Sequence, residues 1–317
     1  MNSDKIEALL ERIAIALERL ASQSNYRGDF PERPHSNTDA NKVSADSSAS
    51  NSNSPATYSI LESFLNSRGI QIKVRPADDA ADQVIDSLSL YLGEHYDALS
   101  GLLSKIKRAM QTGTVITESL KGKPQQDISS ACQFCTRLYE VAFLEQYQYF
   151  RSPVYLIKAK TTTLPKAQRF FGGQWLERFI LQKVKAVYKQ VSSEVTGELE
   201  FEHLINPQIT LPNGDDFELD ILTAIGQHIY WIEAKSSDYQ QYVAKYSKFA
   251  RLLGLDLEHS FMVLTDVPDD RCDALSSLFS MSVCTLHTFE DKLLAVVRAD
   301  TAQQSATADG LSLAAER

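Results

Sequence analysis

The fold of this 317-residue chain is decided by two short segments, FELDIL at Phe217–Leu222 and IYWIEAK at Ile229–Lys235. Both are rich in β-branched and aromatic residues, which favour β-strands. Gly226 and Gln227 lie between them, and glycine at the first position of a two-residue loop suits a type II′ turn. The sequence therefore predicts an antiparallel β-hairpin.

The register of this hairpin brings charged residues together. With a two-residue loop, Asp220 lies directly opposite Glu233, and Glu218 lies opposite Lys235. Side chains alternate along a strand, so Glu233 and Lys235 share one face. We therefore expect Asp220, Glu233 and Lys235 to meet, although a strand with an ordinary exposed Glu/Lys ladder would show the same residues.

This grouping predicts a metal site with hydrolytic chemistry. Two carboxylates that face each other at ~5 Å repel one another, and a hard divalent cation bound by oxygen atoms would neutralise them. Asp220 and Glu233 are the expected ligands of Mg²⁺ or Mn²⁺, which would polarise a phosphoryl oxygen and lower the pKa of a bound water. Lys235 would orient or help to deprotonate this water and stabilise the charge that develops on the phosphate.

A predicted helix that precedes the hairpin carries a carboxylate on its apolar side. Over residues 174–190 the apolar side chains fall on one arc of the helix, and Glu177 lies in the middle of this arc. A buried carboxylate without a partner is costly. Glu177 therefore either forms a salt bridge with a buried base or supports the metal site.

The helix and the hairpin together resemble the PD-(D/E)xK nuclease superfamily. Asp220, Glu233 and Lys235 match its D-x(n)-ExK residues, and Leu219 stands where the familiar proline precedes the aspartate. More narrowly, GGQWLE at residues 172–177 and ELD at residues 218–220 are similar to the nuclease domain of CRISPR-associated endonucleases that cyclic oligonucleotides activate. The resemblance covers about residues 170–298.

The resemblance implies both a fold and an activity. The implied fold is α/β, with a restriction-endonuclease-like core in which helices flank a mixed β-sheet. The implied activity is metal-dependent hydrolysis of phosphodiester bonds in DNA or RNA, with Asp220, Glu233 and Glu177 at the metal and Lys235 assisting. Those CRISPR enzymes carry a Rossmann-like sensing domain before the nuclease, whereas this chain has a mainly helical segment there, so activation by a cyclic oligonucleotide is not carried over. The alternative is a catalytically silent module of this fold that binds nucleic acid or a partner protein.

Composition along the chain indicates five parts. Residues 1–22 are expected to form an amphipathic helix with a heptad seam, which either joins two copies of the chain into a homo-oligomer through residues 3–22 or docks on the main body. Residues 23–55 are rich in Ser, Asn and Asp, which predicts a disordered linker. The remaining parts are a mainly helical domain (56–165), the nuclease-like domain (166–300) and a flexible tail (301–317). In the helical domain, helices are expected over residues 81–110 and 128–149. In the nuclease-like domain, strands are expected over residues 199–211 and 217–224.

The charge of the chain is unevenly spread. A net charge of −9 argues against a nonspecific nucleic-acid binder. However, residues 151–190 carry nine basic residues and one acid, whereas residues 191–317 carry eight basic residues and 21 acids. The two regions either neutralise each other as solvated faces or place a basic strip beside an acidic site. In the second case the candidates for phosphate contacts are Arg178, Lys185, Lys189 and Lys245.

Other features narrow the class of protein. No apolar run approaches the ~20 residues that cross a bilayer, the N-terminus lacks a signal-peptide pattern, and four cysteines fit a reducing compartment, so we expect a cytoplasmic protein. The sequence contains no phosphate-loop, Rossmann or HExxH motif. Its six histidines are scattered without ligand spacing, which favours isolated surface or core histidines.

Overall fold

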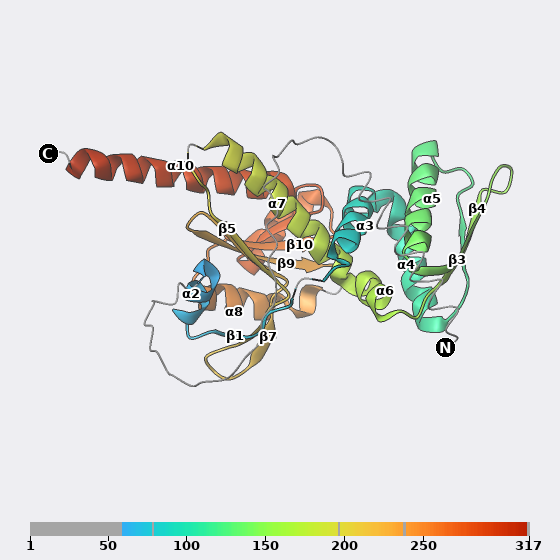
Figure 1. Cartoon of the computed structure of the whole chain (residues 1–317), viewed down its shortest axis with the longest axis horizontal. Coiled ribbons are helices and arrows are strands. Elements are labelled where there is room, and N and C mark those ends of the chain that lie inside the picture. Colours follow the sequence, from blue (N-terminus) through green and yellow to red (C-terminus); the bar gives the residue numbers. More distant parts are fainter. Residues whose placement is uncertain (1–58, 78, 196, 237–238, 316–317) are drawn as a thin grey trace, which may run out of the picture.

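The computed structural model describes residues 59–77, 79–195, 197–236 and 239–315. The expected N-terminal helix with its oligomer contact (1–22) and the expected linker (23–55) lie outside these residues. Figure 1 shows two parts side by side, an α/β body around a five-stranded sheet and a smaller part of helices and a three-stranded sheet.

The α/β body is built on a mixed sheet of five strands. These are β5 (Phe201–Ile205), β8 (Ile221–Ile225), β9 (His228–Lys235), β10 (Ser260–Leu264) and β11 (Ser282–Thr285). They lie in the order β11–β10–β9–β8–β5, with β8 antiparallel to both β5 and β9, and β9, β10 and β11 parallel. This is the α/β class with a helix-flanked mixed sheet that the sequence predicted.

Helices cover both faces of this sheet (Figure 1). On one face lie α7 (Trp175–Glu194) and α10 (Phe289–Ala315), and on the other lie α2 (Ile60–Asn66), α8 (Val243–Leu253) and α9 (Cys272–Phe279). β9 contributes to both layers because its side chains alternate: Ile232 belongs to the core under α7, and Trp231 to the core under α8. A carboxylate at position 233 is therefore an exception in a strand buried on both faces.

β5 and β8 continue beyond the sheet as a bent ribbon. The sequence predicted unbroken strands over 199–211 and 217–224, but each is interrupted and resumes as β6 (Gln208–Thr210) or β7 (Asp216–Glu218). The interruptions fall at Asn206–Pro207 and at Leu219–Asp220, opposite one another.

The bend has a local cause. Pro207 has no N–H for the ladder, and Asn206 has a φ of 52°, a left-handed conformation that asparagine tolerates. The pairing of the ribbon keeps one register across the bend. Glu218 therefore pairs with Gln208 in a second sheet, of order β1–β6–β7 with β1 at Gln71–Val74, and does not lie opposite Lys235 as expected.

The smaller part combines helices with its own antiparallel sheet of order β2–β4–β3. Its elements are α3 (Asp82–Glu94), α4 (Tyr96–Thr112), β2 (Ile116–Ser119), α5 (Gln125–Glu140), β3 (Leu144–Phe150) and β4 (Leu156–Thr161). The helix expected over 81–110 is broken at His95, and the one expected over 128–149 ends at Glu140, because Ala142 has a φ of 60°. The strands of 56–165 make it less helical than predicted.

Two segments connect these parts. α6 (Pro165–Arg169) and a π-helical turn (Phe170–Gln174) lead into α7, and both phenylalanines of the turn are buried in a core that side chains of the two parts share. α2 and β1 lie before the smaller part in the sequence but pack on the α/β body. The division into domains at 165/166 stays a prediction.

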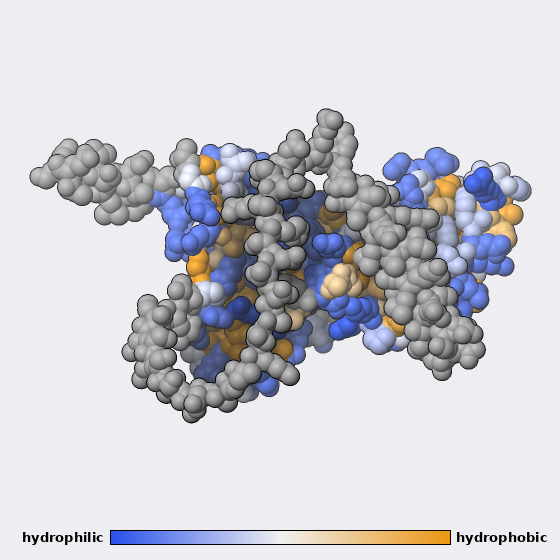
Figure 2. All heavy atoms as spheres, viewed as in Figure 1, coloured by the Kyte–Doolittle hydropathy of each residue, from blue (hydrophilic) through white to orange (hydrophobic). Residues whose placement is uncertain are grey.

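The C-terminal segment differs from expectation. A flexible tail was predicted over 301–317, but α10 continues as a helix to Ala315. Thr301 is buried, and its hydroxyl donates to the Val297 carbonyl (2.9 Å), as is common for a helical threonine. No helix within the described ranges has the length and apolarity needed to cross a membrane. Figure 2 shows hydrophilic residues interspersed with smaller hydrophobic areas on the described part of one face.

Candidate active site at the bend of the ribbon

The hairpin has the predicted register. Ile221 pairs with Ile232 and Ile225 with His228, so the next position of this ladder sets Asp220 opposite Glu233. The N–H of Asp220 donates to Glu233 Oε1 (3.2 Å). Lys235 Nζ lies 2.7 Å from Asp220 Oδ2 and 3.2 Å from Glu233 Oε2. The structure therefore brings the three predicted residues together at the end of β9 where the ribbon bends.

Asp220 is held by the backbone as well as by Lys235. It lies just before β8, at the bend, and its Oδ2 accepts a hydrogen bond from the N–H of Ala234 (2.8 Å) and another from Lys235 Nζ (2.7 Å). Its side chain is only 9% exposed. The bend thus turns this carboxylate back onto β9.

Glu233 is a fully buried carboxylate inside the sheet. Its Oε1 accepts from Trp231 Nε1 (3.0 Å), whereas its Oε2 has an ion pair with Lys235 but no hydrogen bond of good geometry among the described residues. Burial and, after it, the charge of Asp220 raise the pKa of Glu233 to about 8. An additional cation at this point would be stabilised.

Lys235 remains an ammonium ion in this surrounding. Burial alone would lower its pKa, but the charges of Glu233 and Asp220 outweigh burial and raise it above the ordinary value. The ring of Tyr246 on α8 lies 5.6 Å from Nζ. In this state Lys235 donates hydrogen bonds and positive charge, and it is not a proton acceptor.

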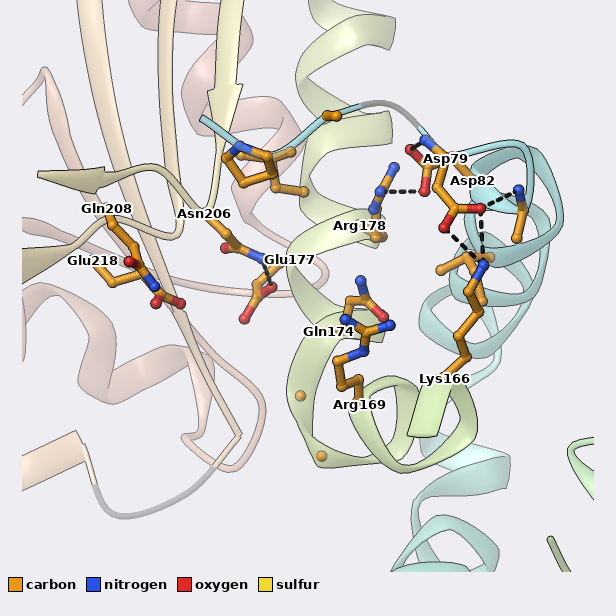
Figure 3. A pocket seen from close by; sticks show the side chains of 17 residues that line it. Asp79, Asp82, Lys166, Arg169, Gln174, Glu177, Arg178, Asn206, Gln208 and Glu218 are labelled. Atoms are coloured by element: carbon orange, nitrogen blue, oxygen red, sulfur yellow. Dashed lines mark hydrogen bonds and ion pairs between the residues drawn. The ribbon is translucent and has the colours of Figure 1, made fainter. Parts of the chain in front are cut away.

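Glu177 approaches the site from α7. It is half-buried, and its Oε2 accepts a hydrogen bond from Asn206 Nδ2 (2.8 Å) (Figure 3). Burial and the charge of Asp220 raise the pKa of Glu177 to about 7, so it lies within electrostatic range of Asp220. Among the described residues Glu177 forms no salt bridge with a buried base, which was the first of the two alternatives.

Sequence reasoning missed Asn206 and Tyr246. Asn206 precedes a proline, and this Asn-Pro pair is a turn signal that a strand drawn through 199–211 overlooked. On α8 the sequence pointed to Lys245, but the neighbouring Tyr246 faces Lys235. Lys245 Nζ instead lies 4.2 Å from the ring of Phe217, in a separate groove with Lys248 and Arg251.

A cavity of about 690 Å³ opens beside Glu177 (Figure 3). Its wall on the ribbon carries Asn206, Gln208 and Glu218, and its other side carries Gln174 and Arg169. Among the four predicted catalytic residues, Glu177 is the one that lines it. The cavity therefore reaches the candidate site at Glu177, and Asp220, Glu233 and Lys235 do not line it.

Part of the expected basic strip is paired within the molecule. Arg178, 12% exposed, pairs with Asp82 (2.6 Å) and Asp86 (3.3 Å) of α3, and Lys166 pairs with Asp79 (2.7 Å). Lys185 is half-buried and Lys189 is exposed on α7. A role for Arg178, Lys185, Lys189 or Lys245 in nucleic-acid binding stays a prediction.

Comparison with known proteins adds a likeness of fold. No protein-family model and no curated protein matches the sequence. Similar solved structures include protein VC1899 from Vibrio cholerae (17% identity, TM-score 0.49) and Can2 from Sulfobacillus thermosulfidooxidans in complex with cyclic tetra-adenylate (14% identity, TM-score 0.45). Each match covers 75% of this chain, which spans about 60% of the length of either protein. At these identities the likeness concerns the fold alone.

Proposed function

We propose that this protein is a divalent-metal-dependent nuclease that hydrolyses phosphodiester bonds of DNA or RNA. The observation that carries the proposal is the grouping of Asp220, Glu233 and Lys235 at the end of β9. Lys235 Nζ lies 2.7 Å from Asp220 Oδ2 and 3.2 Å from Glu233 Oε2, and the N–H of Asp220 donates to Glu233 Oε1 (3.2 Å). Glu177 lies across from them on α7 with a raised pKa that Asp220 helps to cause.

The residues fit a hard divalent cation. Asp220, Glu233 and Glu177 offer carboxylate oxygens, the ligands that Mg²⁺ and Mn²⁺ prefer. Two buried oxygen atoms, Glu233 Oε2 and Asn206 Oδ1, have no hydrogen-bond partner of good geometry among the described residues. Lys235 Nζ lies 3.2 Å from Glu233 Oε2, and a cation bound by the carboxylates would add to the stabilisation that this ammonium group gives. When bound, Mg²⁺ would supply polarisation of the phosphoryl oxygen and a more acidic water.

The side chains of the chain have separable tasks in this proposal. Asp220 and Glu233 would hold the cation, and Glu177, kept in place by Asn206, would support it. Lys235, an ammonium ion with three donors, would orient the attacking water and stabilise the charge that builds on the phosphate. Its high pKa makes a positioning and electrostatic part more suitable for it than removal of a proton.

The test is a cleavage screen on single- and double-stranded DNA and RNA with Mg²⁺ or Mn²⁺, and with EDTA as the metal-free control. Asp220→Asn keeps the shape of the side chain, and Lys235→Ala removes the ammonium group. Each is expected to lower the rate by about 10²–10³-fold. Glu258→Gln, at an exposed residue, is the matched control and should cleave like the wild type.

Two results would contradict the proposal. Cleavage that both variants retain in full would remove Asp220 and Lys235 from the mechanism. A protein that binds nucleic acid but shows neither cleavage nor Asp220-dependent binding of Mn²⁺ would be the catalytically silent module instead.

A further inference from the structure

We propose a second metal site, formed by His228, His259 and Asp300 at the opposite end of β9 from the candidate active site, that binds a transition metal ion of the Zn²⁺ class. His228 begins β9, His259 directly precedes β10, and Asp300 lies on α10. His228 and Glu233 are five residues apart on one strand, which is a separation of roughly 17 Å. The two sites are therefore distinct.

The ligand atoms have the spacing of a coordination sphere. One atom from each of the three residues lies within 4.8 Å of the other two. His259 Nε2 is 3.2 Å from Asp300 Oδ2, and His228 Nδ1 is 3.8 Å from Asp300 Oδ1. In a tetrahedral site with metal–ligand distances of ~2.0–2.1 Å, neighbouring ligand atoms are ~3.3 Å apart. Small side-chain adjustments would close the set around one ion.

A carboxylate behind His259 prepares its ring for coordination. His259 Nδ1 lies 2.7 Å from Asp256 Oδ1. A carboxylate accepts hydrogen bonds, so Nδ1 carries a proton, and the lone pair of a neutral His259 would then be on Nε2. Asp256 Oδ1 also accepts from the backbone N–H groups of Glu258 and His259 (3.0 Å each), which fixes it. This carboxylate–histidine pairing is usual behind metal-bound histidines.

The lone pair of His259 then faces another acceptor. Asp300 is buried, and its Oδ2, 3.2 Å from Nε2, already receives the hydroxyl hydrogen of Tyr230 (2.6 Å). Two acceptor atoms at this distance repel one another unless a proton or a metal ion lies between them. A metal ion also accounts for His228, whose Nδ1 points to the other oxygen of the same carboxylate.

The ligand types select the class of metal. Two imidazoles with one carboxylate suit Zn²⁺ and its neighbours, whereas Mg²⁺ prefers oxygen ligands alone. This site has no signature in the sequence, because its two histidines lie 31 residues apart and neither belongs to a ligand motif. With three protein ligands, a fourth position would remain for water.

The experiment counts metal ions bound to the full, tag-free chain after chelator treatment. We expect one equivalent of Zn²⁺, and with Co²⁺ a visible spectrum typical of four-coordinate cobalt. The double variant Asp220→Asn/Glu233→Gln, which disables the candidate active site, should keep this equivalent, so this result is independent of the proposed nuclease function. Cys132→Ser, at a half-buried thiol, should keep it as well.

Variants at the second site should lose the bound equivalent of Zn²⁺. His228→Gln, at a half-exposed residue, should abolish the Co²⁺ spectrum and the rise of the melting temperature with added Zn²⁺ while far-UV circular dichroism stays native. Asp256→Asn should weaken Zn²⁺ binding by about 10–100-fold. A wild-type chain that takes up no stoichiometric Zn²⁺, or a His228→Gln chain that binds Zn²⁺ as well as the wild type, would overturn the proposal. In either case a proton shared by His259 and Asp300 would explain the cluster.

Discussion

Replacing Glu233 by glutamine should make the metal-free protein less sensitive to pH. The folded pKa of Glu233 is raised from 4.5 to about 8, first by burial and then by Asp220. The folded state therefore holds a proton that the unfolded chain has released over about pH 4.5 to 8, and stability falls as pH rises through this window. Glutamine has nearly the same shape and no charge, so it removes this contribution.

The size of the effect follows from the shift. One pKa unit corresponds to about 1.4 kcal/mol, so a rise from 4.5 to about 8 sets an upper limit of about 5 kcal/mol lost between the ends of the window. Lys235 shares its charge with Glu233 and Asp220, and the measured loss is expected to lie below this limit. The unfolding free energy of the wild type should fall by at most about 1.4 kcal/mol per pH unit relative to Glu233→Gln.

The assay is urea unfolding in EDTA at several values from about pH 5 to pH 8, on the wild type, Glu233→Gln and the exposed control Glu258→Gln. The unfolding free energy of the wild type should fall relative to that of Glu233→Gln as pH rises from about 5 to 8, while Glu258→Gln follows the wild type. Parallel curves for wild type and Glu233→Gln would refute the reasoning, because they would mean that Glu233 binds its proton equally in the folded and unfolded states.

Three further predictions concern the stability of the fold, two at the candidate site and one between α3 and α7. Lys235→Met removes the positive partner of the buried Asp220 carboxylate and should cost about 3–5 kcal/mol in metal-free urea unfolding at neutral pH. A change below about 1 kcal/mol would mean that this ion pair is unimportant. Asn206→Ala should lower the unfolding free energy by about 1–3 kcal/mol, because the hydrogen bond to Glu177 is lost. Glycine tolerates the φ of 52° at this position, so Asn206→Gly separates the loss of the hydrogen bond from backbone strain. Equal stability of the wild type and both variants would contradict this. Gly93→Ala would place a Cβ 2.2 Å from the Phe179 ring and should lower the unfolding free energy by about 1–3 kcal/mol. Adding Phe179→Leu to the same chain should restore part of this stability. An additive loss in the double variant would show that the two residues do not compete for space.

The parts of the structure that the sequence predicted well depend on local pairing. The hairpin register requires only the two-residue loop and the alternation of β8 and β9, and Asp220, Glu233 and Lys235 lie together as this register demands. Glu177 was detectable because a carboxylate interrupts an apolar helix face. In both cases a charged residue stood where the local pattern called for an apolar one.

The parts that were mispredicted depend on contacts across the chain. The strand predicted over 217–224 breaks at Leu219–Asp220, where it pairs with the Asn206–Pro207 break of the other strand. The segment predicted as a flexible tail continues α10 to Ala315, and Asp300, just before it, accepts a hydrogen bond from Tyr230 of the distant strand β9. Periodicity along one segment contains no information on such partners.

The same reasoning explains why a count of charges along residues 151–190 overstates the unpaired positive charge of this segment in the fold. Residues 151–190 have an excess of basic side chains, but in the fold Arg178 and Lys166 face the acids of α3 and of the segment before it. Arg178 therefore links α3 to α7, whereas the pair of Lys166 and Asp79 is about half exposed at the surface. A phosphate bound at the cavity beside Glu177 would meet these paired cations together with Arg169 and Gln174, which line the same cavity. The positive charge available to such a phosphate would thus be smaller than the count of basic residues suggests, and a divalent ion bound by the neighbouring carboxylates would add to it.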